Sequence, residues 1–480
     1  MFNRWARIGA ATVVAKAARN LSTWTTVTAL VAAGLVLTPG SALAAVSSSP
    51  PPTPQLGTSG KDGTVEVVRQ IVQCGNIMYA VGRFTQVKNP SSATLITRNN
   101  AFAFSATAPH VITAFNPNVN GQVDTVVCGT DGSVLLGGTF STAGGAANRN
   151  LAKVNATTGV SMPFSFHPGG RVTHMEVVKD RAGVTHLLVG GYFAGYLDSR
   201  DPVSGADDGY GTPVITGNYN DPDWSPAAHA TRIYNMTVSP RPNNQDIPGG
   251  PAVLMTGVFN NVGGQAHEQI FRLNLTAGAA TVSAWTPNEL FQHCYTGQPF
   301  YAQDAAWSPD GTKIFTATTG YKPHNTQAGS TPRTGPCDAV IAYPATEEAF
   351  GSRTNGDPLA PGNHLWINYV NCDSLYSVAA DATTVFTAGH QRYVSKLAGP
   401  SIGCDDNTGT NPDLVSQPGL AEFDPGTGNH QPGPSRGRGV GAEDLLRTSA
   451  GLWIASDNQA NTNSCAGVFN RMGICFLPNA

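Results

Sequence analysis

Seven polar residues stand at matching places in the sequence, each just before an apolar run. They are Gln70, Asp124, His174, Asn235, Asp304, Ser374 and Asp444. A histidine and carboxylates held together can act as acid and base or bind a metal. The four that could form such a catalytic set are Asp124, His174, Asp304 and Asp444. The plainer interpretation, which we favour, is that these groups hydrogen-bond to neighbouring strands and water, as buried polar groups must.

An acidic segment at residues 194–212 suggests a different chemistry. Its candidate binding residues are Asp198, Asp201, Asp207, Asp208 and Tyr210. Four carboxylates on a Gly-containing loop could hold Ca²⁺, which takes six to eight oxygen ligands. The spacing is not that of a known calcium motif, so we favour a solvated acidic loop and predict no cofactor and no bound metal. The same interpretation applies to Asp405, Asp406 and Asp413 in residues 393–418.

Aromatic and basic residues form a third candidate group. Trp224, Trp285, Tyr295 and Trp366 have histidines nearby in the sequence. Exposed rings of this kind stack on sugars, whereas buried ones pack between sheets. Arg436 could meet an anionic ligand, or belong to a mobile Gly-rich loop. We place Trp224, Trp366 and Arg436 on the predicted binding face, and both interpretations stay open.

Several catalytic and nucleic-acid signatures are absent from the sequence. It contains no H-E-x-x-H and no P-loop. Removing the four basic residues of the first 44 from the 28 Lys and Arg leaves 24 against 31 Asp and Glu, a net charge of about −7. This balance argues against a nucleic-acid partner.

A repeated phrase predicts the strands that position these residues. It reads YAVGRF at Tyr79–Phe84, LLGGTF at Leu135–Phe140, LVGGYF at Leu188–Phe193 and LMTGVF at Leu254–Phe259, with weaker copies beginning near residues 315, 386 and 452. Each copy has a strand before it and further strands after it, joined by turn residues such as Asp131-Gly132. Four antiparallel strands repeated seven times predict an all-β, seven-bladed propeller over residues 63–480.

The fullest copy, LGGTFSTAGGAANRNLAKVNATTG at Leu136–Gly159, resembles the repeat of secreted bacterial, especially actinobacterial, propeller proteins of the delta-sixty type. The resemblance extends from about Val67 to the C-terminus, and the second and fourth copies match closely. It implies that the glycines and the aromatic residue serve packing. It implies no catalytic residue.

The loops after the second strand of each repeat are uneven. They are short at 141–148 and 260–268 but long at 194–212, 321–337 and 393–418. Long loops on a rigid scaffold usually carry binding groups. We therefore predict that these insertions build one face of the channel and that the ligand binds there.

The first 62 residues and the cysteines indicate export. A basic start, an apolar run and Ala42-Leu43-Ala44 predict a signal peptide over residues 1–44. Residues 45–62 are rich in Pro, Ser and Thr and predict a flexible tether, and no later segment has transmembrane length. The even cysteine count predicts four disulfides, and the preferred pairs, among 105 pairings, are Cys74–Cys128, Cys294–Cys337, Cys372–Cys404 and Cys465–Cys475.

Two functions from different classes fit these features. The favoured one is a secreted, non-catalytic binding or scaffold protein of the extracellular or envelope space, which we expect to be monomeric. Its partner would be a polysaccharide, a peptide or another secreted protein. The alternative is a propeller enzyme, a glycan hydrolase or lyase, with a His/carboxylate site at the channel mouth.

Overall fold

The computed structural model describes residues 46–57, 65–217, 231–240, 251–287, 289–291, 300–320, 336–346, 363–370, 373–399, 411–437, 441–458 and 464–480. Within these ranges the regular structure is β, apart from one 3-10 helix, η1 (Glu289–Phe291). In this part of the chain no helix has the length and apolar character needed to cross a membrane. The predicted signal peptide and residues 58–62 of the predicted tether lie outside the described residues.

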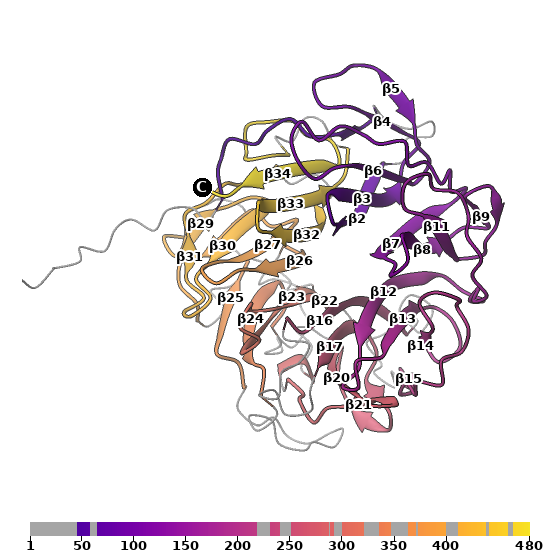
Figure 1. Cartoon of the computed structure of the whole chain (residues 1–480). Coiled ribbons are helices and arrows are strands. Elements are labelled where there is room, and N and C mark those ends of the chain that lie inside the picture. The colour runs from indigo at the N-terminus through magenta and orange to yellow at the C-terminus, as the bar shows by residue number, and fades with distance from the viewer. Residues whose placement is uncertain are drawn as a thin grey trace, which may run out of the picture. The chain divides into compact units, whose positions relative to one another are not determined.

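Seven main sheets of three or four antiparallel strands follow one another along the described chain (Figure 1). The first three contain β2 (Val67–Cys74), β3 (Ile77–Arg83) and β6 (Ala101–Ser105); β7 (Gln122–Cys128), β8 (Ser133–Thr139) and β11 (Leu151–Asn155); β12 (Val172–Lys179), β13 (Thr185–Gly191) and β14 (Leu197–Arg200). The fourth and fifth contain β16 (Arg232–Val238), β17 (Ala252–Val258), β20 (Ile270–Thr276) and β21 (Ala279–Val282); β22 (Phe300–Trp307), β23 (Lys313–Gly320), β24 (Ala339–Pro344) and β25 (Trp366–Tyr369). The last two contain β26 (Leu375–Ala380), β27 (Val385–Gly389), β30 (Leu420–Phe423) and β31 (His430–Gln431); β32 (Ala442–Thr448), β33 (Gly451–Ser456) and β34 (Ile474–Pro478).

Short strands extend the connections between the second and third strands of four main sheets. They are β4 (Gln86–Lys88) and β5 (Leu95–Thr97), which pair with β1 (Gln55–Leu56); β9 (Thr142–Ala143) and β10 (Ala146–Ala147); β18 (Asn261–Val262) and β19 (Gln265–Ala266), which pair with β15 (Ile215–Thr216); β28 (Tyr393–Ser395) and β29 (Leu414–Ser416). The glycine pair of the repeat makes the turn between β9 and β10, where Gly144 and Gly145 have φ of 63° and 82°. Glycine adopts this left-handed region at little cost.

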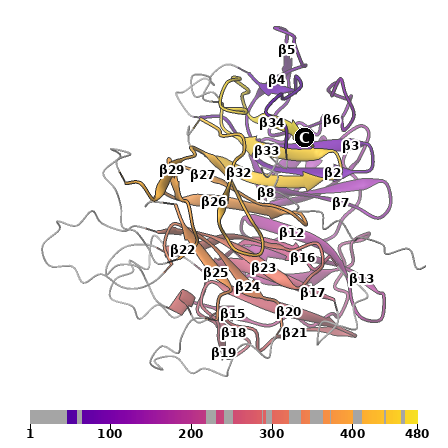
Figure 2. The ribbon, with the colours of Figure 1, turned by 90° about the vertical axis from the view of Figure 1, so that its left-hand side faces the viewer.

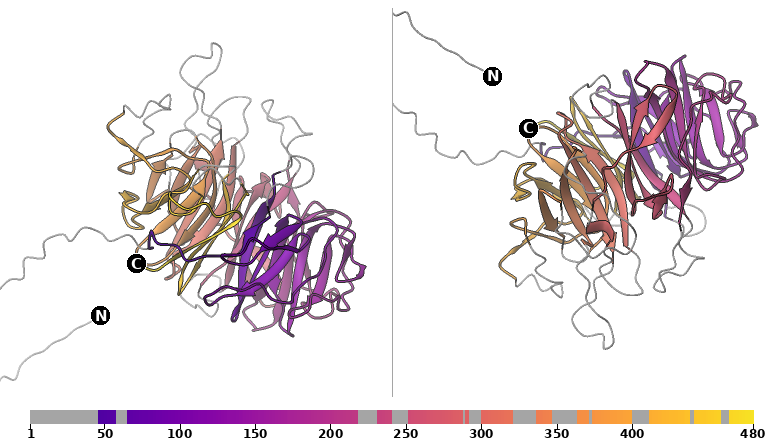
Figure 3. Two further views of the ribbon diagram at one scale, coloured as in Figure 1. Left: turned by 90° about the horizontal axis from the view of Figure 1, so that it is seen from above. Right: turned by 90° about the horizontal axis from the view of Figure 1, so that it is seen from below.

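Each hydrophobic core fills the space between two neighbouring main sheets. One cluster joins the first and second sheets, and others follow pair by pair to the sixth and seventh. A further cluster joins the seventh sheet to the first, with Trp453 and Phe476 packed near Phe104. Figure 2 shows β2, β7, β12 and β16 following one another across the molecule, and Figure 3 shows the sheets packed through their faces. Small antiparallel sheets stacked in this way are the architecture of a β-propeller.

Residues 46–57 pack on the last main sheet. Val46 is fully buried and forms a bridge with Asn479, and the backbone N–H of Leu56 donates to the Met472 carbonyl at 3.0 Å. The prediction of a flexible tether is therefore wrong for these residues. The reason is that β34 offers unpaired backbone groups at a sheet edge, and Val46 and Leu56 supply apolar side chains that are buried there.

Two of the predicted disulfides are confirmed, Cys74–Cys128 and Cys465–Cys475. The first joins the ends of β2 and β7, at equivalent places in neighbouring sheets. Cys337 is also disulfide-bonded. Cys294, Cys372 and Cys404 lie outside the described residues, so the other two predicted pairs stay predictions.

Candidate functional site

Every first strand of a main sheet has a β-bulge at the same place. In each one the pairing register with the second strand shifts by one residue. The extra residues, here called the bulge layer, are Arg69, Asp124, Thr173, Tyr234, Gln303, Tyr376 and Glu443. A bulge re-aims a side chain that would otherwise follow the strand alternation.

The repeated glycine of the sequence phrase stands opposite the bulge. Gly257 pairs with Ile233, and a Cβ on it would lie 2.1 Å from the Arg232 carbonyl oxygen. Gly138 and Gly191 make equally close approaches to their first strands. Glycine within a strand marks such a close approach of backbone. The motif that predicts the fold thus also marks where each first strand is bulged.

The residues directly after the bulges form a second layer, the clasp layer. It consists of Gln70, Thr125, His174, Asn235, Asp304, Ser377 and Asp444. Several of these side chains accept a backbone N–H from the next first strand. Gln70 accepts from Val126 at 2.7 Å and Asp304 from Val378 at 2.8 Å.

The clasp also joins the last main sheet to the first. Asp444 of β32 accepts the Ile71 N–H of β2 at 2.9 Å. These bonds satisfy backbone donors on strand edges that would otherwise lack a partner.

The predicted polar row agrees with the clasp layer at five of its seven positions. Asp124 instead belongs to the bulge layer, and Thr125 takes the clasp place. Ser374 lies three residues before its expected place, which Ser377 occupies. An alignment on apolar runs cannot locate an inserted bulge residue, which explains the error of one position.

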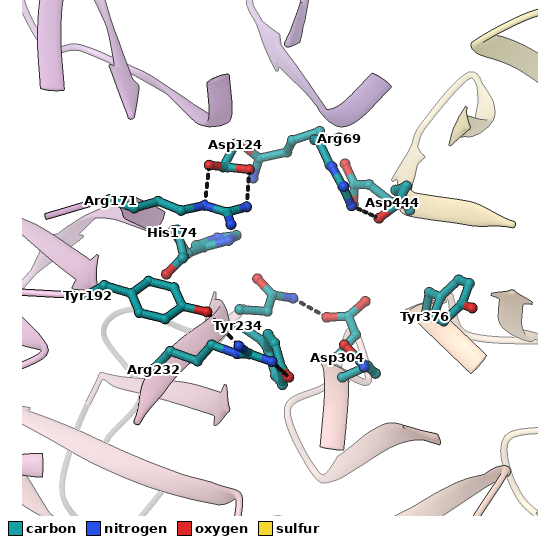
Figure 4. A pocket seen from close by; sticks show the side chains of 15 residues that line it. Arg69, Asp124, Arg171, His174, Tyr192, Arg232, Tyr234, Asp304, Tyr376 and Asp444 are labelled. Atoms are coloured by element: carbon teal, nitrogen blue, oxygen red, sulfur yellow. Dashed lines mark hydrogen bonds and ion pairs between the residues drawn. The ribbon is translucent and has the colours of Figure 1, made fainter. Parts of the chain in front are cut away.

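All seven bulge residues line one pocket of about 310 Å³, shown in Figure 4. Five clasp residues also line it, together with Arg171, Tyr192 and Arg232. None of these lining residues is aliphatic. A second hollow of about 360 Å³ lies further along the first strands and shares the same five clasp residues, Gln70, His174, Asn235, Asp304 and Asp444. The clasp layer therefore separates the two hollows.

Three arginines with different partners stand in the pocket. Asp124 accepts two hydrogen bonds from Arg171, at 2.8 and 2.7 Å. Arg69 forms an ion pair with Glu443. Arg232 instead donates to the hydroxyl of Tyr192, at 2.6 Å.

Neither Arg171 nor Arg232 was predicted from the sequence as a site residue. A signal was present, because each immediately precedes the bulged segment of its strand, in RVTH and RIYN of consecutive repeats.

The buried carboxyl groups of the candidate catalytic set lie on the pocket floor. Burial, together with the nearby Asp444, raises the pKa of Asp304 to about 7. Burial likewise raises the pKa of Asp444 to about 6, while His174 acts in the opposite direction.

The oxygens of these carboxyl groups are engaged by their neighbours. Those of Asp304 accept from Val378, Asn235 and Ala305, and Asp124 is held by Arg171. These are the contacts that the plainer interpretation expects.

The acidic segment does not belong to the pocket. Residues 194–212 contain β14, the third strand of its sheet, so Asp198 lies within a strand. Asp201, Asp207 and Asp208 follow the far end of β14, away from the pocket. Tyr210 is 5% exposed and stacks on His186. For the buried Tyr210, placement on the binding face is therefore wrong. The four aspartates lie away from the pocket, and their place on a binding face stays a prediction. The polar sequence LDSR concealed a strand.

Two other predicted binding residues are buried. Trp366 packs near Phe315, and its indole N–H donates to the Pro425 carbonyl at 3.2 Å. Arg436 is fully buried and lies 3.9 Å from Asp457. Neither can stack on or pair with a ligand at the surface, so their assignment to the binding face is also wrong. Trp224 lies outside the described residues.

The prediction of three long loops has a mixed outcome. Residues 393–418 do form an insertion, which contains the β28–β29 hairpin. The insertion predicted at 321–337 lies almost wholly outside the described residues. Within the described chain, no group of three or more His, Cys, Asp or Glu side chains is arranged to hold a metal ion.

No protein-family model and no curated protein matches the chain. Among solved structures it is similar to Sqt1 of Saccharomyces cerevisiae, at 10% identity and a TM-score of 0.43, over 90% of this chain and 99% of that one. It is similar to the WD40 β-propeller domain of Doa1, at 10% identity and a TM-score of 0.39, over 88% and 96%. It is also similar to the RRP9 WD40 repeats, at 8% identity and a TM-score of 0.40, over 87% of this chain and 100% of that one. At these values the described geometry, rather than the likenesses, carries the fold assignment.

Proposed function

We propose that the main sheets are seven blades of one closed propeller. Support comes from the first strands, which contact one another in chain order, and from β32, which contacts β2. The hydrophobic cluster between the seventh and first sheets and the bond from Ile71 to Asp444 act at the same junction. The N-terminal segment strengthens it, because the backbone of residues 46–57 bonds to Pro478 of β34 and to Met472 before the chain enters β2.

We propose further that the protein is a non-catalytic binding or scaffold protein whose ligand enters the pocket of the bulge layer. The bulge layer carries this proposal: seven equivalent positions hold six different residue types, and all of them line one pocket. The position opposite the bulge, which serves close packing, is glycine in five of the seven sheets, with Thr318 and Ser456 in the other two. Diversity at a place that geometry keeps identical fits recognition of an asymmetric ligand.

The extracellular or envelope location is part of the same proposal. Disulfides form and persist mainly in oxidising compartments, and the described chain contains two with a third cysteine bonded. The repeat at Leu136–Gly159 supports kinship with the secreted delta-sixty-type propellers. The partner is a polysaccharide, a peptide or a secreted protein, met by a monomer.

Filling the pocket tests the binding proposal. Gln303 lines the pocket, so Gln303→Trp should occupy it and remove binding to any ligand found on a glycan and peptide array. Lys179→Ala, an exposed change at the far end of β12, is the control and should bind as the wild type does. If Gln303→Trp stays folded and still binds, the ligand site is elsewhere and the proposal is wrong.

A glycan hydrolase or lyase is the second candidate, and one observation favours it. Asp304 and Asp444 have pKa values raised to about 7 and about 6 beside His174, as acid–base catalysis near neutral pH requires. It is the weaker proposal because the carboxyl oxygens already accept hydrogen bonds from backbone and Asn235. Glycan cleavage by the wild type, lost in Asp304→Asn at unchanged Tm, would establish it instead.

A further inference from the structure

Arg232 differs from the other two arginines of the pocket in its counter-charge. Arg171 and Arg69 each pair with a carboxylate. Among the described residues no carboxylate forms an ion pair with Arg232, although its side chain is partly buried in the pocket wall. Its partners are the hydroxyls of Tyr192 and Tyr234, and its guanidinium lies 4.6 Å from the centre of the Tyr234 ring. An anionic ligand gains the most binding free energy where it pairs with a half-buried cation that has no other counter-charge.

The two tyrosines extend this site rather than neutralise it. Each hydroxyl accepts a hydrogen bond from Arg232, so its own O–H remains a donor. Burial raises the pKa of Tyr234, which keeps that proton in place. One guanidinium and two hydroxyl donors lie together on one side of the pocket in Figure 4. Such donors suit a carboxylate, which only accepts.

The remaining wall suits the rest of a sugar rather than a peptide end. It offers acceptors on Asp124 and Glu443, and both donor and acceptor groups on Gln303 and Asn235. Sugar hydroxyls use both kinds of group, and the Tyr376 ring can stack on a sugar face. Since no aliphatic residue lines the pocket, an apolar side chain of a peptide has no complementary surface. The volume of about 310 Å³ lies at the small end for ligand sites, which fits one or two sugar rings.

We propose that the pocket binds an acidic sugar, whose carboxylate is held by Arg232, Tyr192 and Tyr234. This inference rests on the proposed binding function and names the ligand class. The hydroxyls of the same sugar would lie against the Asp124 and Glu443 side of the pocket.

Calorimetric titration with a galacturonate trisaccharide and with its carboxyl-reduced, neutral form tests the inference. The acidic form should bind about tenfold or more tightly than the neutral form, since hydrogen bonds to charged groups are strong. Its affinity should fall as salt is added. Arg232→Gln should remove the preference, whereas Arg149→Gln, which changes an arginine outside the pocket, should keep it. Arg232→Lys keeps the positive charge but loses the planar guanidinium, so it should bind the acidic trisaccharide several-fold more weakly at an unchanged Tm. If Arg232→Gln does not fold, the result for Arg232→Lys decides the test.

The outcomes separate this inference from the function on which it rests. Equal binding of the two trisaccharides, or no binding of either at millimolar concentration, overturns the acidic-sugar assignment. If a peptide with a free C-terminal carboxylate binds instead and Gln303→Trp abolishes its binding, the pocket function stands and the sugar class is wrong. If Gln303→Trp leaves every detected ligand bound, the pocket function fails as well.

Discussion

The bulge layer and the clasp layer occupy adjacent residues of the same strands, yet the first faces the pocket and the second joins neighbouring sheets. Gln303 faces the pocket, while Asp304, the next residue, joins its strand to Asn235 and Val378 of other sheets. Both layers hold six residue types at seven positions, but several clasp residues accept backbone N–H groups of the next first strand, whereas all seven bulge residues line the pocket. One inserted residue per strand therefore frees a position for recognition without breaking the contacts between sheets.

The largest expected effect comes from replacing the glycine that lets the first strand bulge against the second. In Gly257→Ala, the new Cβ would lie 2.1 Å from the Arg232 carbonyl oxygen, so the bulge must move or the strands separate. We expect a loss of about 3 kcal/mol or more in the free energy of unfolding, measured by chemical denaturation. The matched change Gly169→Ala meets no atom within 4 Å and should cost less than about 0.5 kcal/mol. Equal stability of the two variants would show that the glycine does not shape the bulge.

Substitutions at the neighbouring residues Asp304 and Gln303 compare the layers directly. Asp304→Ala leaves the Val378 N–H and the Asn235 amide without their acceptor in a buried place, at a cost of about 2–3 kcal/mol. Gln303→Ala removes a side chain from the pocket lining and should cost under about 1 kcal/mol. Thermal or denaturant unfolding of both variants measures the difference. A larger loss for Gln303→Ala would reverse the roles assigned to the two layers.

Much of the architecture could be predicted from the sequence because it depends on repetition. The glycine and the aromatic residue recur at fixed spacing, and the second strands of the first four main sheets end one or two residues before the phrase does. Cys74 and Cys128 occupy equivalent places in neighbouring repeats, which is why their pairing could be predicted and is confirmed.

The candidate site was harder to predict, because it arises from departures from the repeat. An extra residue in each first strand leaves the apolar pattern intact but shifts the register, so Asp124 was aligned with the wrong layer. Arg232 and the tyrosines converge only after the sheets pack, and no local pattern predicts that. The polar strand Leu197–Arg200 carries no strong apolar alternation, so its aspartates were interpreted as a loop. Burial of Trp366 and Arg436 likewise depends on long-range packing.

The clasp residue Asp304 should make the protein less stable as the pH rises, and this sign can be measured. Burial raises the pKa of Asp304 to about 7, above its value of about 3.9 in an unfolded chain. Between these values the folded state holds a proton that the unfolded state has lost, so this residue's contribution to stability falls as pH rises from about 4 to about 7.

Three histidines oppose this trend, because burial lowers the pKa of His110, His267 and His430. Their contribution to stability is lost as pH falls. The wild type must therefore be compared with Asp304→Asn, which shares these histidines. From pH 5 to pH 8 the wild type should lose about 2–3 kcal/mol relative to the variant, measured by denaturant titration at each pH. Parallel curves would mean that Asp304 ionises normally in the fold.

The smallest effect on stability should come from the ion pair in the bulge layer. Arg69 and Glu443 pair at a partly exposed place, with side chains 33% and 18% exposed, so either Arg69→Gln or Glu443→Gln should cost less than about 1 kcal/mol. Their effects on binding should have opposite signs. Removing Arg69 leaves the Glu443 carboxylate alone in the pocket and should weaken binding of the galacturonate trisaccharide several-fold. Glu443→Gln keeps an amide oxygen for the sugar hydroxyls but leaves the Arg69 guanidinium as a second unpaired positive charge in the pocket, so it should strengthen binding. Both variants break the same ion pair, so a structural defect caused by its loss would change the affinity of both in the same direction. Opposite changes in affinity can come only from the change in the charge of the pocket, which is what the acidic-sugar proposal requires.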